Sequence, residues 1–296
     1  MRLFDTHCHF ERAEPSEIAA VLKRAKAAGV EKLMAVGGSP ALNESAALAG
    51  ELGSLGSLKS LESHASLKTI EDIKGSRPFG TLESHASLKT LETLKTLPKV
   101  CCALGFDREQ VSSAPSVFSP TGTGLAAWGE IGLDYHYSPE TRAQQLELFS
   151  SQLQQAHERN LPVVIHTREA ADDTIALLKE IPSRGIIHCF TGDPDEARAY
   201  LDLGFYISFS GIITFRLADN VRASGLIVPD DRILIETDSP FLAPVPMRGN
   251  PNEPAFIKYT CEFIADLRGV AADDFAELTF ANAVRILGGD DLKSIN

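Results

Sequence analysis

Runs of apolar, largely β-branched residues alternate along the chain with segments whose apolar positions recur at helical spacing. The apolar runs predict eight strands, at residues 2–10, 32–38, 100–106, 125–134, 162–167, 185–190, 205–211 and 232–240. Helical periodicity predicts helices at 15–29, 138–160 and 169–181. Near-continuous apolar strands that alternate with helices are typical of a parallel sheet covered by helices on its faces.

Eight strand–helix units in 296 residues favour an α/β fold of the closed (β/α)8 type, a TIM barrel formed by a single domain, 1–296. An open doubly wound sheet is the alternative, because periodicity alone does not show that a sheet closes. In a barrel all eight strands end on the same face, and active sites of such barrels lie there. Polar residues at the strand ends are therefore the candidates for a functional site.

One segment interrupts the alternation between the second and third predicted strands. The sequence LESHASLKT occupies 61–69 and returns unchanged at 82–90, within a stretch rich in serine, leucine and lysine. Two copies are too few for a stacked repeat array. We interpret 53–98 as a low-complexity surface insertion, in which short amphipathic helices could pack on the barrel. The functional alternative is that His64 and His85 bind a metal or a partner.

Imidazole and carboxylate groups interrupt the apolar strands near their predicted ends. In the first strand Asp5, His7 and His9 lie two apart, so they would share one face while Cys8 points to the other. The remaining groups follow later strands: Glu130, His166, His188 and Asp238. A buried group of this kind is costly unless it is paired or bound to a metal.

Six of these residues form the predicted metal centre, namely His7, His9, Glu130, His166, His188 and Asp238. Any single one of the histidines could equally be a hydrogen-bonded core residue, but six coincidences at strand ends are improbable. Mixed nitrogen and oxygen donors suit Zn, Mn, Fe or Co, and suit Mg less well. Because six ligands exceed one tetrahedral site, we expect two divalent metal ions (Zn, Mn, Mg or similar) bridged by a carboxylate.

Cysteine content, apolar segments and net charge indicate the cellular compartment and the partners to expect for this protein. The five cysteines form no CxxC motif, so we expect free thiols and a reducing compartment. No leader-like apolar stretch precedes the first strand, and the apolar run at 204–215 is too short to span a bilayer. We therefore expect a cytoplasmic protein without a membrane partner. The net charge of −12 disfavours tracking along duplex phosphates but permits a nucleic-acid end to enter a pocket that holds cations.

Five motifs, taken in order and spacing, resemble those of the TatD family of metal-dependent hydrolases: FDTHCH, GEIGLDY, PVVIHTREA, HCFTG and ETDSPFLAPVPMRGNPNEP. The resemblance runs from Leu3 to about Leu287 and is interrupted by the insertion. It implies a TIM barrel with a divalent metal centre, and for several members a deoxyribonuclease activity on DNA ends. It also implies a ligand assignment, in which His7, His9 and Asp238 hold the first metal, Glu130 bridges, and His166 and His188 hold the second.

Two loops depart from the family pattern. Members usually carry Gly-x-His-Pro after the third strand, whereas this chain has LGFDREQ, with Phe106 and Asp107 at the positions of Ile or Val and of His. After the eighth strand Met247 replaces a histidine, while Arg248 remains. Both departures fall on loops expected to face substrate, not on the predicted metal ligands.

The expected catalytic residues are Asp238, as general base for a water acidified by the cations, and Glu130. Arg248 could clamp a phosphate by paired hydrogen bonds or be a solvated loop arginine, and we expect Asp134 to contact substrate from the pocket wall. Glu236 is interpreted as a supporting residue behind the ligands.

The predicted function is a deoxyribonuclease or phosphodiesterase that acts as a monomer on single-stranded or frayed DNA ends. A first alternative is a hydrolase of another ester, an amide or a lactone on the same centre, because barrels of this type carry many chemistries. A second alternative is a binding protein without enzymatic activity that uses 53–98 as an interaction arm.

Overall fold

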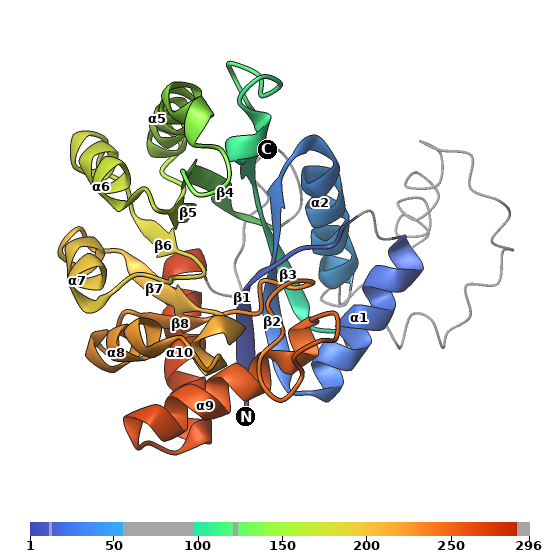
Figure 1. Ribbon diagram of the computed structural model, residues 1–296. Coiled ribbons are helices and arrows are strands. Elements are labelled where there is room, and N and C mark those ends of the chain that lie inside the picture. Colours follow the sequence, from blue (N-terminus) through green and yellow to red (C-terminus); the bar gives the residue numbers. More distant parts are fainter. Residues whose placement is uncertain (12–13, 56–96, 121–123, 289–296) are drawn as a thin grey trace, which may run out of the picture.

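The computed structural model describes residues 1–11, 14–55, 97–120 and 124–288, and in it eight parallel strands follow one another in sequence order around one sheet (Figure 1). The strands are β1 (Leu3–Cys8), β2 (Val30–Gly38), β3 (Lys99–Phe106), β4 (Leu125–Asp134), β5 (Val163–Arg168), β6 (Gly185–Ile187), β7 (Tyr206–Phe209) and β8 (Ile233–Ile235). The described α-helices are α1 (Pro15–Ala27), α2 (Pro40–Leu55), α5 (Arg142–Glu158), α6 (Ala171–Glu180), α7 (Pro194–Asp202), α8 (Asp219–Ile227), α9 (Ile257–Arg268) and α10 (Ala272–Leu287). The predicted eight strand–helix alternation is confirmed.

The sheet closes where β1 meets the segment after β8. Cys8 forms a parallel bridge with Ser239, and the backbone N–H of His9 donates to the carbonyl of Ser239 at 2.8 Å. The N–H of Asp238 donates to the carbonyl of His7 at 2.9 Å. The fold is therefore a closed barrel and not an open sheet, and the carboxyl ends of all strands meet on one face.

Four strands end earlier than their apolar runs predict, namely β1, β6, β7 and β8. Two residues after these strands have positive φ angles. Cys189, which directly follows His188, has a φ of 45°, and Asp238 has a φ of 55°. A left-handed residue cannot continue an extended strand, so the chain turns at these points. His188 and Asp238 consequently lie on short segments beyond the strands, at the mouth of the barrel.

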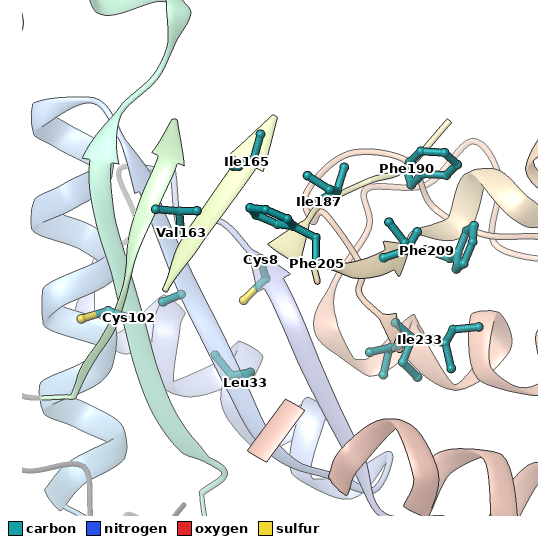
Figure 2. Close-up of a cluster of buried hydrophobic side chains, with 14 of the residues drawn as sticks. Cys8, Leu33, Cys102, Val163, Ile165, Ile187, Phe190, Phe205, Phe209 and Ile233 are labelled. Carbon is teal, nitrogen blue, oxygen red and sulfur yellow. The ribbon is translucent and has the colours of Figure 1, made fainter. Parts of the chain in front are cut away.

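The apolar core occupies the space around the strands and at the amino-terminal end of the barrel. Strand residues such as Cys8, Leu33 and Ile165 pack with helix residues in one large buried cluster, part of which Figure 2 shows. A second cluster joins Phe4 of β1 to Phe280 of α10, with ring centroids 5.8 Å apart. Because α10 packs near the start of β1, apolar side chains fill the amino-terminal end of the barrel. The polar residues of interest lie at its carboxyl end.

The predicted insertion falls almost entirely outside the described residues. The helix α2 extends to Leu55 and β3 begins at Lys99, and the two copies of LESHASLKT lie in 56–96. The surface insertion and any role of His64 and His85 therefore stay predictions. All five cysteines are free thiols, as expected. Among the described helices, none combines the length and apolar composition needed to cross a bilayer.

Candidate metal centre

Four side chains meet at the mouth of the barrel, from β1 and the residue after it, from within β4, and from the segment after β8. The Nε2 atoms of His7 and His9 lie 3.1 Å apart. Glu130 places Oε2 3.5 Å from the first of these nitrogens and 3.7 Å from the second. Asp238 places Oδ1 at 3.8 and 3.6 Å from the same two atoms. These four donor atoms form the group that we call position one.

The other oxygen of Glu130 faces a second group. Its Oε1 lies 3.3 Å from Nδ1 of His166, at the end of β5, and 3.5 Å from Nε2 of His188, after β6. The two nitrogens are 3.3 Å apart. These three donor atoms form position two. One carboxylate therefore touches both groups, with a different oxygen in each.

The donor geometry fits divalent cations. Ligands at roughly 2.0–2.2 Å from a tetrahedral ion stand about 3.3–3.6 Å from one another. The distances in position two, 3.3–3.5 Å, lie in this range, and those in position one, 3.1–3.8 Å, lie around it. The Nε2 atoms of His7 and His9 are 3.1 Å apart, and if each presents a lone pair, neither can donate a hydrogen bond to the other. A cation between them removes that conflict. Within the described residues, His7, His9 and Glu130 form one group able to hold a metal, and Glu130, His166 and His188 form another.

Hydrogen bonds fix three of the four imidazole rings from behind. His9 donates from Nδ1 to the carbonyl of Val36 at 2.9 Å. His166 lies with Nε2 3.0 Å from Oδ2 of Asp134, and His188 lies with Nδ1 3.3 Å from Oε1 of Glu236. When the outer nitrogen of an imidazole carries the proton, the inner nitrogen keeps a lone pair for a metal. The three rings are thus oriented and set in the tautomer that ligation requires.

Glu236 supports the centre from a fully buried place, as the interpretation of a residue behind the ligands expected. Its Oε1 also accepts the backbone N–H of Cys189 at 2.7 Å. The rings of His7 and His188 stack at 4.0 Å with 13° between their planes. Nδ1 of His7 and Oε2 of Glu236 are buried, and in the part of the chain that the structure describes neither has a hydrogen-bond partner. Because Glu236 contacts His188 and lies near His7, it can fix the relative positions of the two rings.

Two glycines of the GEIG segment let β4 lie close to β5 at this point. A Cβ atom on Gly132 would come 1.9 Å from the carbonyl oxygen of His166, and one on Gly129 would come 2.7 Å from Cβ of Val164. Gly132 also has a φ of 142°, which L side chains rarely adopt. The glycines therefore set the approach of the two strands that carry Glu130 and His166.

The electrostatic environment keeps both carboxylates ionised. Burial would raise the pKa of Glu130, but the charge of His188 and hydrogen bonds from His188 and His7 hold it well below its usual value. Burial opposes ionisation of Asp238 as well, yet its hydrogen bond with His9 and the nearby imidazoles lower its pKa. Both groups are consequently anionic at neutral pH and able to bind a cation or accept a proton.

The pKa values of His7 and His188 are shifted in opposite directions. Burial lowers the pKa of His7. Burial would also lower the pKa of His188, but the charges and hydrogen bonds of Glu130 and Glu236 raise it well above its usual value. The two buried rings thus differ in how firmly they hold a proton. A cation that binds either ring competes with a proton for the nitrogen.

Asp134, which we expected to contact substrate, lies behind His166. The residue is fully buried, and its Oδ1 accepts the backbone N–H groups of His136 and Tyr137 at 3.0 and 2.9 Å. Burial would raise its pKa, but the hydrogen bond with His166 lowers it to about 2. With its two oxygens used in this way, Asp134 orients a ligand in this structure and does not face the pocket.

Asp5 also departs from the expected shared face with His7 and His9. The pairing of β1 with β2 shifts register between Asp5 and Cys8, so strict alternation does not continue to the histidines. The carboxylate of Asp5 instead accepts from Oγ1 and N of Thr237, at 2.6 and 2.9 Å. Asp5 thereby anchors the segment that carries Asp238. Burial raises the pKa of Asp5 to about 7, against the effect of these hydrogen bonds.

Arg108 is a site residue that the sequence analysis did not single out. Its Nη1 donates to Oε1 of Glu130 at 3.2 Å, and its Nε lies 3.9 Å from Oδ2 of Asp134. The arginine follows β3 in the loop that departs from Gly-x-His-Pro, and that departure was the one available signal. Asp107, at the position of the motif histidine, accepts the N–H of Glu109 at 2.8 Å and so caps a short 3-10 turn (Arg108–Gln110).

Arg248 lies on the exposed loop after β8, apart from the metal positions. Its guanidinium stacks over the ring of Phe215, 3.9 Å from the centroid. Together with Arg216, Leu217 and Val245 these two residues line a hollow of about 430 Å³. An aromatic ring beside exposed guanidinium groups can accept a base and a phosphate. The contact between Arg248 and a phosphate stays a prediction.

Comparison with known proteins shows the family of the chain and agrees with the fold. A family model described as TatD related DNase matches residues 4–288. The chain is 50% identical over 166 residues to the uncharacterized metal-dependent hydrolase YcfH of Escherichia coli K12, and 43% identical over 165 residues to the uncharacterized metal-dependent hydrolase YabD of Bacillus subtilis. Each match includes 55% of this chain, and 63% and 65% of the respective relative, so less than two thirds of either relative is spanned.

A solved structure extends the likeness of the fold to almost the whole chain. The TatD homologue YjjV of Escherichia coli K12 superposes with a TM-score of 0.71, covering 97% of this chain and 98% of its own. At 24% sequence identity this match speaks for the barrel fold alone.

Proposed function

The chain belongs to the TatD family of metal-dependent hydrolases, and from this premise we propose that it hydrolyses phosphodiester bonds at the ends of DNA strands, with two divalent cations as cofactors. The observation that carries the proposal is the placement of Glu130 between two groups of imidazoles, one at each oxygen. A bridging carboxylate is the usual arrangement of two-metal centres that displace a group at phosphorus.

Asp238 is the proposed proton acceptor. Divalent cations bound at the centre would supply an acidified water and offset the negative charge that builds on the phosphate. Asp238 lies within 4 Å of both His7 and His9, is kept ionised by them, and has a partly exposed side chain. It can therefore take the proton of an attacking water and return it to the leaving oxygen.

The surroundings of the mouth support an anionic substrate. Arg168 is the last residue of β5, and Arg108, Arg216 and Arg248 follow β3, β7 and β8. These four arginines bring positive charge to one end of the barrel in a chain whose net charge is −12. Arg248 over Phe215 suits a base and its phosphate more than a paired duplex, since stacking needs an unpaired base. We therefore propose single-stranded or frayed DNA ends as the substrate.

The test is digestion of labelled oligonucleotides by protein stripped with a chelator, before and after Mn²⁺, Zn²⁺ or Mg²⁺ is added back. We expect no cleavage without cations, and stepwise shortening of a single strand from one end when a cation is restored. A blunt duplex should be cut more slowly than a frayed one. A panel of small esters, amides and lactones is assayed beside it. Hydrolysis confined to that panel would replace the nuclease with the alternative hydrolase, and cleavage that persists without cations would reject both.

A further inference from the structure

Arg108 places a positive charge directly on the bridging carboxylate. Its Nη1 contacts Oε1 of Glu130 at 3.2 Å, the same oxygen that faces His166 and His188. The side chain is 18% exposed, and its Nε is buried with no hydrogen-bond partner among the described residues. The guanidinium is thus held beside position two by charge more than by a full set of hydrogen bonds.

The two positions therefore differ in charge before any cation binds. Position one has two carboxylate oxygens, Oδ1 of Asp238 and Oε2 of Glu130. Among the described residues, these two oxygens pair with His7 and His9 and with no arginine. Position two has one carboxylate oxygen, from Glu130, and that oxygen already bonds to Arg108. Asp134 offsets part of the arginine charge at 3.9 Å but is itself engaged by His166.

From this asymmetry, and resting on the two-cation centre of the proposed function, we infer that Arg108 makes the two metal positions unequal. Position one, on His7, His9 and Asp238, fills first. Position two, on His166 and His188, binds its cation more weakly, because that cation must share Oε1 of Glu130 with a guanidinium or displace it. Two cations on one carboxylate oxygen repel each other, and burial strengthens the repulsion. Arg108 is in this sense a positioning residue that sets the order of metal loading.

The experiment measures Mn²⁺ binding to the metal-stripped full chain by equilibrium dialysis and by the loss of the free-ion electron paramagnetic resonance signal, without substrate. The wild type is expected to show two steps, the second weaker by about tenfold or more. Arg108→Gln should tighten the second step by roughly tenfold and leave the first within about twofold. Arg108→Lys keeps the charge and should keep the two steps apart.

Controls assign the steps and the cause. Arg198→Gln removes an exposed arginine on α7 whose ion pair is with Asp195 and not with a ligand, and should leave both steps unchanged. His166→Ala should remove the weaker step, and Asp238→Asn should weaken the stronger one. Arg108→Met, which is neutral but of similar length, replaces Arg108→Gln if that variant does not fold by circular dichroism.

The outcomes separate this inference from the proposed function. Two equal steps in the wild type, or a second step that neither neutral variant tightens, would overturn the role of Arg108 while the nuclease proposal stands. A protein that binds no Mn²⁺ would overturn both. The expected shift of the second step, found in a protein that leaves oligonucleotides intact, would support Arg108 and remove the nuclease.

Discussion

Glu130→Gln is expected to lower cation-dependent turnover by at least about a thousandfold, because several kcal/mol of charge stabilisation depend on the bridged centre. Each oxygen of Glu130 faces a different group of ligands. The amide keeps the shape of the side chain, but it has no negative charge and offers an NH₂ group to one of the two positions. Metal binding should weaken at both positions together, measured by equilibrium dialysis beside the turnover assay.

The substitution conserves volume, so the fold should be retained and circular dichroism should be unchanged. Glu147→Gln is the matched control, since Glu147 is exposed on α5 and should leave turnover and metal binding as in the wild type. If Glu130→Gln turned over at the wild-type rate, the carboxylate would not be part of the catalytic centre, and the assignment of both positions would have to be withdrawn.

Asp238→Asn is expected to lower kcat by about a hundredfold to ten-thousandfold, the range associated with a positioned general base. The carboxylate near His7 and His9 is kept ionised, and asparagine can accept neither a proton nor the same share of a cation's charge. Position two uses none of its atoms, so Mn²⁺ binding there should remain. The measurement is steady-state kinetics on a labelled oligonucleotide with saturating Mn²⁺, together with a binding titration.

Asp202→Asn provides the control for this prediction, as an exposed aspartate at the end of α7. A variant at Asp238 with kcat within about threefold of the wild type would show that another group accepts the proton. If both metal positions were lost together in Asp238→Asn, the division of the ligands into two groups would be incorrect, even if activity fell as expected.

The barrel and the convergence of His7, Glu130 and His166 were predictable because each rests on a short-range pattern. An apolar run followed by a polar residue marks the carboxyl end of a parallel strand, and closure brings such ends together whatever their distance in sequence. The glycines beside Glu130 also belong to a local pattern, GEIG, whose reason appears only when β5 is in place. No disulfide or metal constraint had to be known in advance to obtain this part of the fold.

The remaining details depend on contacts between distant segments, which periodicity does not contain. Asp134 ends β4, the strand that carries Glu130, yet it faces His166 and backbone N–H groups. Asp5 follows the same alternation as His7, but a register shift in β1 turns it to Thr237. Arg108 reaches Glu130 through a short turn that Asp107 caps, in a loop where the motif residues had changed. Side-chain direction at such loops is set by packing and not by residue type.

The central claim is that six side chains surround two cations with Glu130 between them. Anomalous diffraction from crystals of the full chain soaked in Mn²⁺ tests it most directly. The account predicts two peaks about 3.5–4 Å apart, one beside His7, His9 and Asp238 and the other beside His166 and His188. Peaks that lie away from Glu130, or a fully soaked crystal with no peak at these residues, would contradict it.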